Sequence, residues 1–224
     1  MAHRNLSSGQ PQERSVWREV ATDVYAASLF DGSECESMLQ AIETQRESAA
    51  CAAESPNSMQ RYGTVVRDPA LSKGIADMLR ERLRHPIREL FQFLPHSELS
   101  EHHAFLTVYG CEGNQDLSLH VDASHITLNI CLHNTAKGSN LVFTGRRCLQ
   151  HLDDVAERPA IAFRFRRGDA LLHVGNQRHF VTSIESGQRK NLVVWSRLEK
   201  TAFDHSNQWV KERCPACNRQ ADSQ

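Results

Sequence analysis

Residues 117–132 read LSLHVDASHITLNICL. Two short segments of this stretch, Leu117–Val121 and Ile126–Leu132, are rich in large apolar and β-branched residues, which favours strands. Polar residues alternate with apolar ones in both segments, as expected of strands whose two faces meet different surroundings. The stretch therefore predicts two strands joined by a short polar connection.

Further short strands are predicted on both sides of this stretch, separated by Gly, Asn and Asp residues. They are Ala104–Tyr109, Leu141–Phe143, Ala160–Phe165, Ala170–His173, Phe180–Ser183 and Asn191–Arg197. Eight short strands within roughly 95 residues predict a sandwich or small barrel. The expected fold class is α+β.

Two amphipathic helices are predicted before the strands. Asp31 can cap the first helix, with Glu34 three positions later in the arrangement of a capping box. The second begins at Asp68-Pro69, an N-cap acid followed by a proline in the first turn. Pro86 is expected to kink or divide this second helix. We therefore expect an N-terminal helical layer outside the strands.

The chain is expected to form one main domain with terminal extensions. Its 224 residues suffice for a single well-buried core. Residues 1–14 are rich in Ser, Gln and Arg, which predicts a disordered lead-in. A helical N-terminal support region is expected over 15–100, the barrel over 101–200, and a tail with a Cys-x-x-Cys motif over 201–224.

Composition excludes several classes of partner. The formal net charge of −1 gives no broad positive field, so neither nucleic acid nor an anionic membrane is expected as a partner. No apolar run reaches the roughly 20 residues that span a bilayer, and Met1–Ser15 lacks the apolar core of a signal peptide. These features predict a soluble intracellular protein, cytoplasmic or nuclear. The 7 scattered cysteines do not suggest a disulfide framework.

A metal site is predicted at the end of the Leu117–Val121 strand. His120 and Asp122 are two residues apart, so their side chains leave the same strand face. His179 follows a later strand, and we expect the Gly168-Asp169 turn to bring it alongside. A His-x-Asp pair alone is a weak signal, but two imidazoles and one carboxylate leave open positions suited to iron(II) oxygen chemistry. Zinc with a bound water could use the same ligands.

Arg189 points to a co-substrate. It lies at the start of the predicted strand that contains Asn191 and Val193, where its guanidinium could face inward. A buried arginine needs a carboxylate partner, which a diacid such as 2-oxoglutarate would supply. The alternative is an arginine exposed on a surface turn.

These motifs resemble those of a known family. The matching segments are His120–Leu132, Gly168–His179 and Arg189, and the likeness extends upstream through Asn57–Gly63 and His102–Tyr109. They are similar to the prolyl/lysyl hydroxylase group of 2-oxoglutarate- and iron(II)-dependent oxygenases, and within it to the 2-oxoglutarate and iron-dependent oxygenase domain-containing proteins. The resemblance covers roughly residues 55 to 217.

The resemblance implies a double-stranded β-helix, or jelly-roll, barrel with iron held by the three metal-binding residues. It places Arg189 on the distal carboxylate of 2-oxoglutarate and implies that Tyr109 and Asn129 also contact this co-substrate. Ascorbate is the implied auxiliary that keeps iron reduced. The implied reaction uses O2 to hydroxylate a peptide or protein side chain, lysyl or prolyl by analogy, and releases succinate and CO2.

Two features leave alternatives open. The sequence Lys137-Gly138-Ser139-Asn140 stands where family members often have a Gly-Gly pair, so the loop over the site is expected to differ. An open, polar loop at Cys111–Asp116 beside the metal would favour a peptide substrate, whereas a closed lid would favour a small molecule or nucleobase. An inactive metal-binding interaction module is a further alternative.

Two other groups of residues have no assigned role. Cys214 and Cys217 could form half of a zinc site or a redox pair, but the sequence shows no partners that would complete a tetrahedron. His125 and His173 are close enough in sequence to the predicted ligands to support them.

Overall fold

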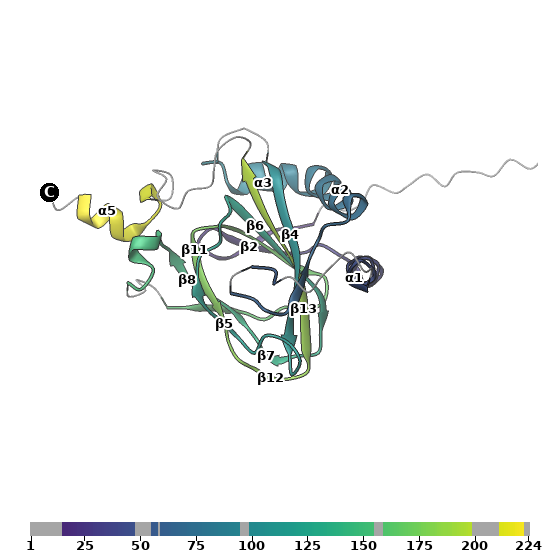
Figure 1. Ribbon diagram of the computed structural model, residues 1–224. Coiled ribbons are helices and arrows are strands. Elements are labelled where there is room, and N and C mark those ends of the chain that lie inside the picture. Colours follow the sequence, from purple (N-terminus) through teal and green to yellow (C-terminus); the bar gives the residue numbers. More distant parts are fainter. Residues whose placement is uncertain are drawn as a thin grey trace, which may run out of the picture.

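The computed structural model describes residues 15–47, 55–57, 59–94, 99–154, 159–198 and 211–221 (Figure 1). The predicted lead-in at 1–14 lies outside these residues. The described part is built mainly from antiparallel strands in two facing sheets. No helix among the described residues is both long and apolar enough to cross a bilayer.

The larger sheet has seven strands in the order β1-β2-β10-β6-β13-β4-β3. Its strands are β1 (Arg18–Ala21), β2 (Val24–Ser28), β3 (Gly63–Val65), β4 (Leu99–Gly110), β6 (Ile126–Asn134), β10 (Asp169–Val174) and β13 (Gln188–Leu198). Every neighbouring pair is antiparallel. Strand β13 lies between β4 and β6 and pairs along almost its whole length with β4.

The smaller sheet has four strands in the order β5-β11-β8-β9. They are β5 (Leu117–His120), β8 (Leu141–Arg146), β9 (Ile161–Phe163) and β11 (Gln177–Val181). A two-stranded ribbon of β7 (Lys137–Gly138) and β12 (Ile184–Ser186) lies at one end (Figure 1).

Side-chain alternation sorts the residues of the central strands into two layers. In β6, the residues from Ile126 to Leu132 at even positions join the core that packs against the helices. The odd residues, such as Cys131, face the smaller sheet, where they meet Phe143 of β8 and Val181 of β11. Because successive side chains of a strand point to opposite faces, one strand contributes both to the helix-covered core and to the space between the sheets.

Helices cover the outer face of the larger sheet. They are α1 (Gly32–Glu47), α2 (Pro69–Met78), the π-helical turn Leu79–Leu83 and α3 (Arg84–Leu90). The main chain of Asp31 donates to Glu34 and that of Glu34 to Asp31, each at 2.8 Å, as the predicted capping box requires. Asp68 accepts from Leu71 and caps α2.

The helix that contains Pro86 is interrupted just before that residue. A proline has no N–H to donate, so the carbonyl four residues earlier loses its helical partner. The interruption takes the form of the π-helical turn Leu79–Leu83, which joins α2 to α3. Its location agrees with the expected division near Pro86.

Some elements differ from their predicted positions. Strands β1 and β2 fall within residues 15–100, where a helical support region was expected, and β2 pairs with β10. These short strands have too few residues to show a clear alternation. The predicted strand Phe180–Ser183 begins earlier, as β11, because the chain turns back immediately after Val174.

Candidate metal and co-substrate site

A cavity of about 250 Å³ lies between the two sheets. Its lining includes all six residues predicted from the sequence, namely His120, Asp122, His179, Arg189, Tyr109 and Asn129. They come from both sheets, so the site exists only once the sheets face each other. The roles of these residues as ligands stay predictions, but their convergence on one cavity is a property of the fold.

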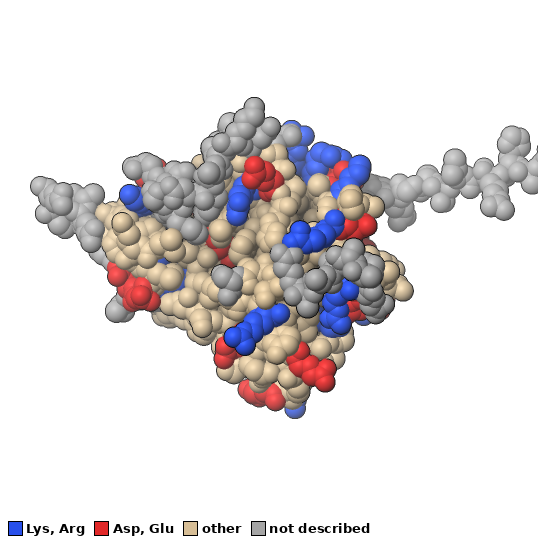
Figure 2. All heavy atoms as spheres, viewed as in Figure 1, with Lys and Arg blue, Asp and Glu red and all other residues tan. Residues whose placement is uncertain are grey.

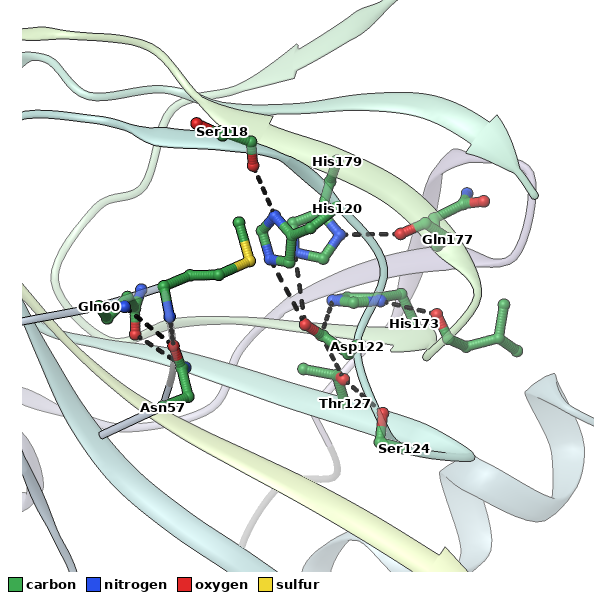
Figure 3. Close-up of polar contacts among 12 residues, drawn as sticks. Asn57, Gln60, Ser118, His120, Asp122, Ser124, Thr127, His173, Gln177 and His179 are labelled. Atoms are coloured by element: carbon green, nitrogen blue, oxygen red, sulfur yellow. Dashed lines mark hydrogen bonds and ion pairs between the residues drawn. The ribbon is translucent and has the colours of Figure 1, made fainter. Parts of the chain in front are cut away.

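The register between β5 and β11 brings the two histidines together. His120 and His179 are directly opposite each other, and their ring centroids are 4.2 Å apart. Oδ1 of Asp122 lies 3.6 Å from Nε2 of His120 and 3.8 Å from Nε2 of His179 (Figure 3). Metal bonds of about 2.1 Å can join atoms up to about 4.2 Å apart, so an ion can join Asp122 to either imidazole. The potential ligand atoms of all three residues lie within 4.8 Å of one another.

Main-chain carbonyls fix the orientation of both imidazoles. Nδ1 of His120 lies 2.7 Å from the carbonyl of Ser118, and Nδ1 of His179 lies 2.8 Å from that of Gln177 (Figure 3). A carbonyl only accepts, so each Nδ1 carries the proton and donates. Each Nε2 therefore faces Asp122, the direction that metal coordination requires.

The Asp122 carboxylate is held by its other oxygen. Oγ1 of Thr127 donates to Oδ2 of Asp122 at 2.7 Å, and the Ser124 hydroxyl lies 2.8 Å from Oγ1 of Thr127 (Figure 3). The main-chain N–H of Asp122 also donates to the Gly175 carbonyl. Oδ1 is thus left facing the imidazoles.

Electrostatics keep this group ready to bind a cation. Burial, followed by the charge of His120, lowers the pKa of His179 to about 3, so its imidazole is neutral near pH 7. Burial alone would raise the pKa of Asp122, but the nearby His179 and His120 lower it far below its ordinary value. Burial would lower the pKa of His120, but the hydrogen bond to Asp122 and its charge raise that pKa above its ordinary value. The site therefore contains a carboxylate and one neutral imidazole, and a bound metal would displace any proton from the other imidazole.

His173 lies beside Asp122 in the same cavity. It is fully buried, and its Nε2 is 3.9 Å from Oδ2 of Asp122 without a hydrogen-bond partner. Nδ1 lies 2.9 Å from the carbonyl of Val174. Burial lowers the pKa of His173, although the charge of Asp122 opposes this effect. Sequence proximity had suggested such a supporting position for His173, whereas His125 does not line the cavity.

Arg189 points inward and is 2 % exposed, which excludes the alternative of a surface arginine. Its guanidinium stacks over the rings of Tyr109 at 4.5 Å and Phe165 at 5.2 Å. It donates to Ser139 and Asn191, and no carboxylate of the described residues forms an ion pair with it. A buried cation paired only with neutral groups is suited to a carboxylate ligand.

Tyr109 contacts Arg189 through its ring, and Asn129 is connected to Arg189 through hydrogen bonds. The Tyr109 hydroxyl accepts from Nε2 of Gln60 at 3.0 Å. Oδ1 of Asn129 accepts from Nδ2 of Asn191 at 2.6 Å, and Asn191 in turn accepts from Arg189. These contacts connect the predicted co-substrate residues to one another.

Two site residues were not identified as such from the sequence. Ser139 accepts hydrogen bonds from Arg189, whereas the sequence marks its segment only by the departure from a Gly-Gly pair. Gln60 lies within Asn57–Gly63, a stretch that had been noted only for its family resemblance. The expected loop at Cys111–Asp116 does not line the cavity, whereas Asn57, Met59 and Gln60 do.

The fold and the site together define a class. Two antiparallel sheets enclose two imidazoles, one carboxylate and a separate buried arginine. This is the arrangement of non-haem iron oxygenases that bind a carboxylate co-substrate.

Sequence relatives identify the family. The chain is 32% identical over 209 residues to the Arabidopsis thaliana 2-oxoglutarate and iron-dependent oxygenase domain-containing protein CP2, covering 89% of this chain and 53% of that protein. It is 28% identical over 201 residues to the human 2-oxoglutarate and iron-dependent oxygenase domain-containing protein 2, covering 89% of this chain and 53% of that protein. The chain belongs to the 2-oxoglutarate- and iron-dependent oxygenases. It spans about half the length of these curated relatives.

Solved structures share the fold at low sequence identity. A Pseudomonas putida prolyl-4-hydroxylase matches with a TM-score of 0.56 and 14% identity, covering 80% of this chain and 94% of that one. The carbocyclase SnoK from nogalamycin biosynthesis matches with a TM-score of 0.59 and 14% identity, covering 79% and 80%. No family model matches the chain. These neighbours catalyse different reactions, so the shared jelly-roll fold does not select a substrate.

Proposed function

We propose that this chain is an Fe(II)- and 2-oxoglutarate-dependent dioxygenase that hydroxylates a peptide or protein side chain and releases succinate and CO2. The observation that supports it most strongly is the joint placement of two units in one cavity. One is the His120, Asp122 and His179 cluster, and the other is the buried Arg189, which forms no ion pair with an acidic group of the described residues. The two facing sheets would then form the double-stranded β-helix of this family.

The three-residue cluster would hold iron(II). Its two imidazole nitrogens and single carboxylate oxygen leave roughly three coordination positions for a chelating co-substrate and O2. When bound, iron and 2-oxoglutarate supply the oxidising chemistry that converts a C–H bond to C–OH. Main-chain carbonyls hold the two imidazoles so that their Nε2 atoms face Asp122, and Thr127 fixes the carboxylate.

Arg189 would bind the distal carboxylate of 2-oxoglutarate. Low polarity strengthens such a charge pair, and the Tyr109 and Phe165 rings shield the guanidinium from water. Oδ1 of Asn129 is engaged by Asn191, so Asn129 would offer its amide N–H groups to the co-substrate. The Tyr109 hydroxyl, which accepts from Gln60, would donate its own proton to the same ligand. Ascorbate would serve as the auxiliary reductant.

A peptide or protein substrate is favoured by the surface next to the cavity. Met59 lines the cavity and is 43 % exposed, and Tyr62 in the same segment is 49 % exposed. An exposed apolar pair beside a buried site suits the docking of a polypeptide around a reacting side chain. Acidic and basic groups are interspersed on the face seen in Figure 2, which gives the described surface there no single-sign field for nucleic acid. A lysyl or prolyl side chain is the target suggested by analogy.

The proposal is tested by uncoupled turnover. We would measure succinate formed from 2-oxoglutarate by purified protein with iron(II), ascorbate and O2, without a prime substrate. Slow succinate production is expected from the wild type and its loss from His179→Ala. Arg189→Ala should require a higher 2-oxoglutarate concentration, since it lacks the cation for the distal carboxylate.

Matched variants separate these effects from general damage. His85→Ala removes a half-exposed histidine and Arg80→Ala an exposed arginine, both on the helical layer. Both should behave like the wild type. Failure of the wild type to bind either iron(II) or 2-oxoglutarate in spectroscopic titrations would refute the proposal and favour an interaction module. If the wild type does turn over 2-oxoglutarate, a product screen with peptides and small molecules would distinguish the substrate classes.

A further inference from the structure

A second cluster of metal-binding side chains lies outside the oxygenase cavity. It consists of Cys148, His151, Cys214 and Cys217, whose potential ligand atoms all lie within 4.8 Å of one another. Cys148 and His151 follow β8, whereas the other two residues belong to the C-terminal segment that contains α5 (Pro215–Ala221). Figure 1 shows α5 beside the end of β8. Two segments more than sixty residues apart thus contribute one pair each.

The distances within the cluster agree with tetrahedral coordination. Zinc bonds of about 2.3 Å to sulfur and 2.05 Å to nitrogen place two sulfurs about 3.8 Å apart, and a sulfur and a nitrogen about 3.6 Å apart. The Sγ atoms of Cys148 and Cys217 are 3.7 Å apart. Nδ1 of His151 is 3.1, 3.6 and 3.5 Å from the sulfurs of Cys148, Cys214 and Cys217. One ion can therefore contact all four atoms.

Local backbone structure presents each pair on one side of a turn. Cys148 caps the 3-10 turn Leu149–His151, and Cys214 immediately precedes α5, whose first turn contains Cys217. Both pairs have a spacing of three residues, and helical geometry brings such positions to the same face. Cys-x-x-Cys and similarly short spacings are typical of structural zinc sites.

A disulfide explains the cluster less well. A disulfide requires sulfurs about 2.05 Å apart, and the Cys148–Cys217 separation of 3.7 Å is instead that of two ligands of one ion. A disulfide also involves two groups, whereas here three thiols surround the ring nitrogen of His151. Thiolates and an imidazole are ligands suited to zinc.

Within the part of the chain that the structure describes, apolar packing alone gives the C-terminal segment little support. Its buried cluster consists of Cys148, Cys214 and Ala216, with Cys217 partly buried against them. A helix of seven residues is unstable by itself because nucleation costs more than so few hydrogen bonds return. The potential ligands themselves thus make up most of this buried cluster.

We propose that Cys148, His151, Cys214 and Cys217 bind one Zn²⁺ in a Cys3His site that fixes the C-terminal segment to the end of β8. A closed set of four protein ligands leaves no position for substrate, so this zinc is structural. The site is distinct from the two-histidine, one-carboxylate cluster and does not depend on its function.

The chain that directly follows His151 also contacts β11, the strand that carries His179. Arg178 precedes His179 in β11. Its Nη1 donates to the main-chain carbonyls of Leu152 and Asp154, which lie one and three residues after His151. Nε of Arg178 donates to Thr144 of β8 at 2.7 Å. Loss of zinc is therefore expected to loosen the support of β11 in addition to releasing α5.

Metal content provides the first test. The full chain, purified under reducing conditions without added metal, should contain about one zinc per molecule by elemental mass spectrometry. The double variant His120→Ala/His179→Ala should retain it, which separates this metal from any at the oxygenase site. Cys214→Ser/Cys217→Ser should lose it, whereas Cys111→Ser, which alters an exposed cysteine elsewhere, should not.

Replacing histidine with a fourth thiol adds a rescue. His151→Ala should bind zinc weakly, and His151→Cys should restore binding because four cysteines also make a tetrahedral site. A zinc chelator should lower the melting temperature of the wild type and of His151→Cys, but not that of Cys214→Ser/Cys217→Ser. Zinc retained after Cys214→Ser/Cys217→Ser is combined with His120→Ala/His179→Ala would overturn the proposal.

Cobalt(II) reports the ligands directly in the wild type, even if a cysteine variant fails to fold. Cobalt added to protein treated with chelator should give the intense visible bands of a tetrahedral ion and a thiolate charge-transfer band in the near ultraviolet. Spectra of octahedral cobalt alone would contradict the proposal. So would peptide mass mapping that finds Cys148 and Cys217 joined by a disulfide in freshly purified protein.

Discussion

The hydroxyl of Ser139 accepts two hydrogen bonds from Arg189, from Nε at 3.1 Å and from Nη2 at 2.9 Å. Ser139 is a non-glycine residue with a φ of 52°. With this left-handed backbone, the Ser139 hydroxyl lies beside the Nε and Nη2 edge of the guanidinium. A glycine at the same position would leave Arg189 with one side-chain acceptor fewer. The departure from a Gly-Gly pair thus falls on the residue that orients the proposed co-substrate-binding cation.

Ser139→Ala should weaken 2-oxoglutarate binding several-fold. Loss of one or two hydrogen bonds to a charged group costs roughly 1–3 kcal/mol, part of which the bound carboxylate would recover. The measurement is the 2-oxoglutarate concentration dependence of succinate production. Ser139→Gly is the matched control, since it also removes the hydroxyl but relieves the backbone of its Cβ. If only Ser139→Ala is impaired, the lost hydroxyl is not the cause, because Ser139→Gly lacks it too. The effect would then come from backbone strain at this position.

Thr127→Val should reduce metal affinity by roughly 10–100-fold, the usual effect of losing a group that orients a metal ligand. Valine has the shape of threonine but cannot donate to Oδ2 of Asp122. The carboxylate would then be free to turn away from His120 and His179. Anaerobic titration with iron(II) or manganese(II) measures the change. Thr64→Val, a buried threonine of β3, should bind metal like the wild type, and equal affinity in both variants would contradict the assigned role.

Gly168→Ala should destabilise the fold strongly, by roughly 3 kcal/mol or more. Gly168 has a φ of +87°, and an added Cβ would lie 2.1 Å from the carbonyl oxygen of Phe30. Its carbonyl accepts from the main chains of Leu29 and Phe30, so this turn joins β10 to the start of the helical layer. Urea unfolding gives the free energy. Gly74→Ala, in open space on α2, should instead stabilise by about 0.5–1 kcal/mol, and similar losses in both would show that tight packing is not the cause.

Local rules predicted the elements that carry the site. The alternation of Thr127, Asn129 and Cys131 with the intervening apolar residues was visible in the sequence, and it is the alternation that separates the cavity from the helix-side core. The capping box of Asp31 and Glu34 needs only the spacing of two residues. Such features depend on neighbours in the chain, so one sequence suffices to find them.

Contacts between distant segments could not be predicted in this way. Ser139 meets Arg189 across fifty residues, and Cys148 meets Cys217 across sixty-nine. The Cys-x-x-Cys motif therefore seemed to lack partners, because Cys148 and His151 come near it only after the C-terminal segment returns to β8. Which sheet a strand joins likewise depends on pairing energies that no local pattern contains.

Stability should fall as the pH is lowered from 7 to 5, in part because of His125. This side chain is 4 % exposed, and its Nδ1 accepts from the main-chain N–H of Leu198. Burial, together with the charge of Arg197, lowers its pKa from 6.5 to about 4. Above pH 6.5 His125 is mostly neutral in both the folded and the unfolded chain, so its full contribution to the free energy of unfolding is present there. Between pH 6.5 and 4 the unfolded chain takes up a proton that the folded chain does not, and stability is lost.

His125→Asn should remove part of this dependence, on the order of 1–2 kcal/mol between pH 7 and pH 5. The asparagine Oδ1 can still accept from Leu198, but it does not titrate. Urea unfolding of wild type and variant at several pH values gives the difference in slope. His85→Asn, at a half-exposed position, should leave the slope unchanged. A wild-type slope in His125→Asn would mean that His125 is protonated in the folded protein near its ordinary pKa, and the acid sensitivity would then have to come from other buried histidines such as His173.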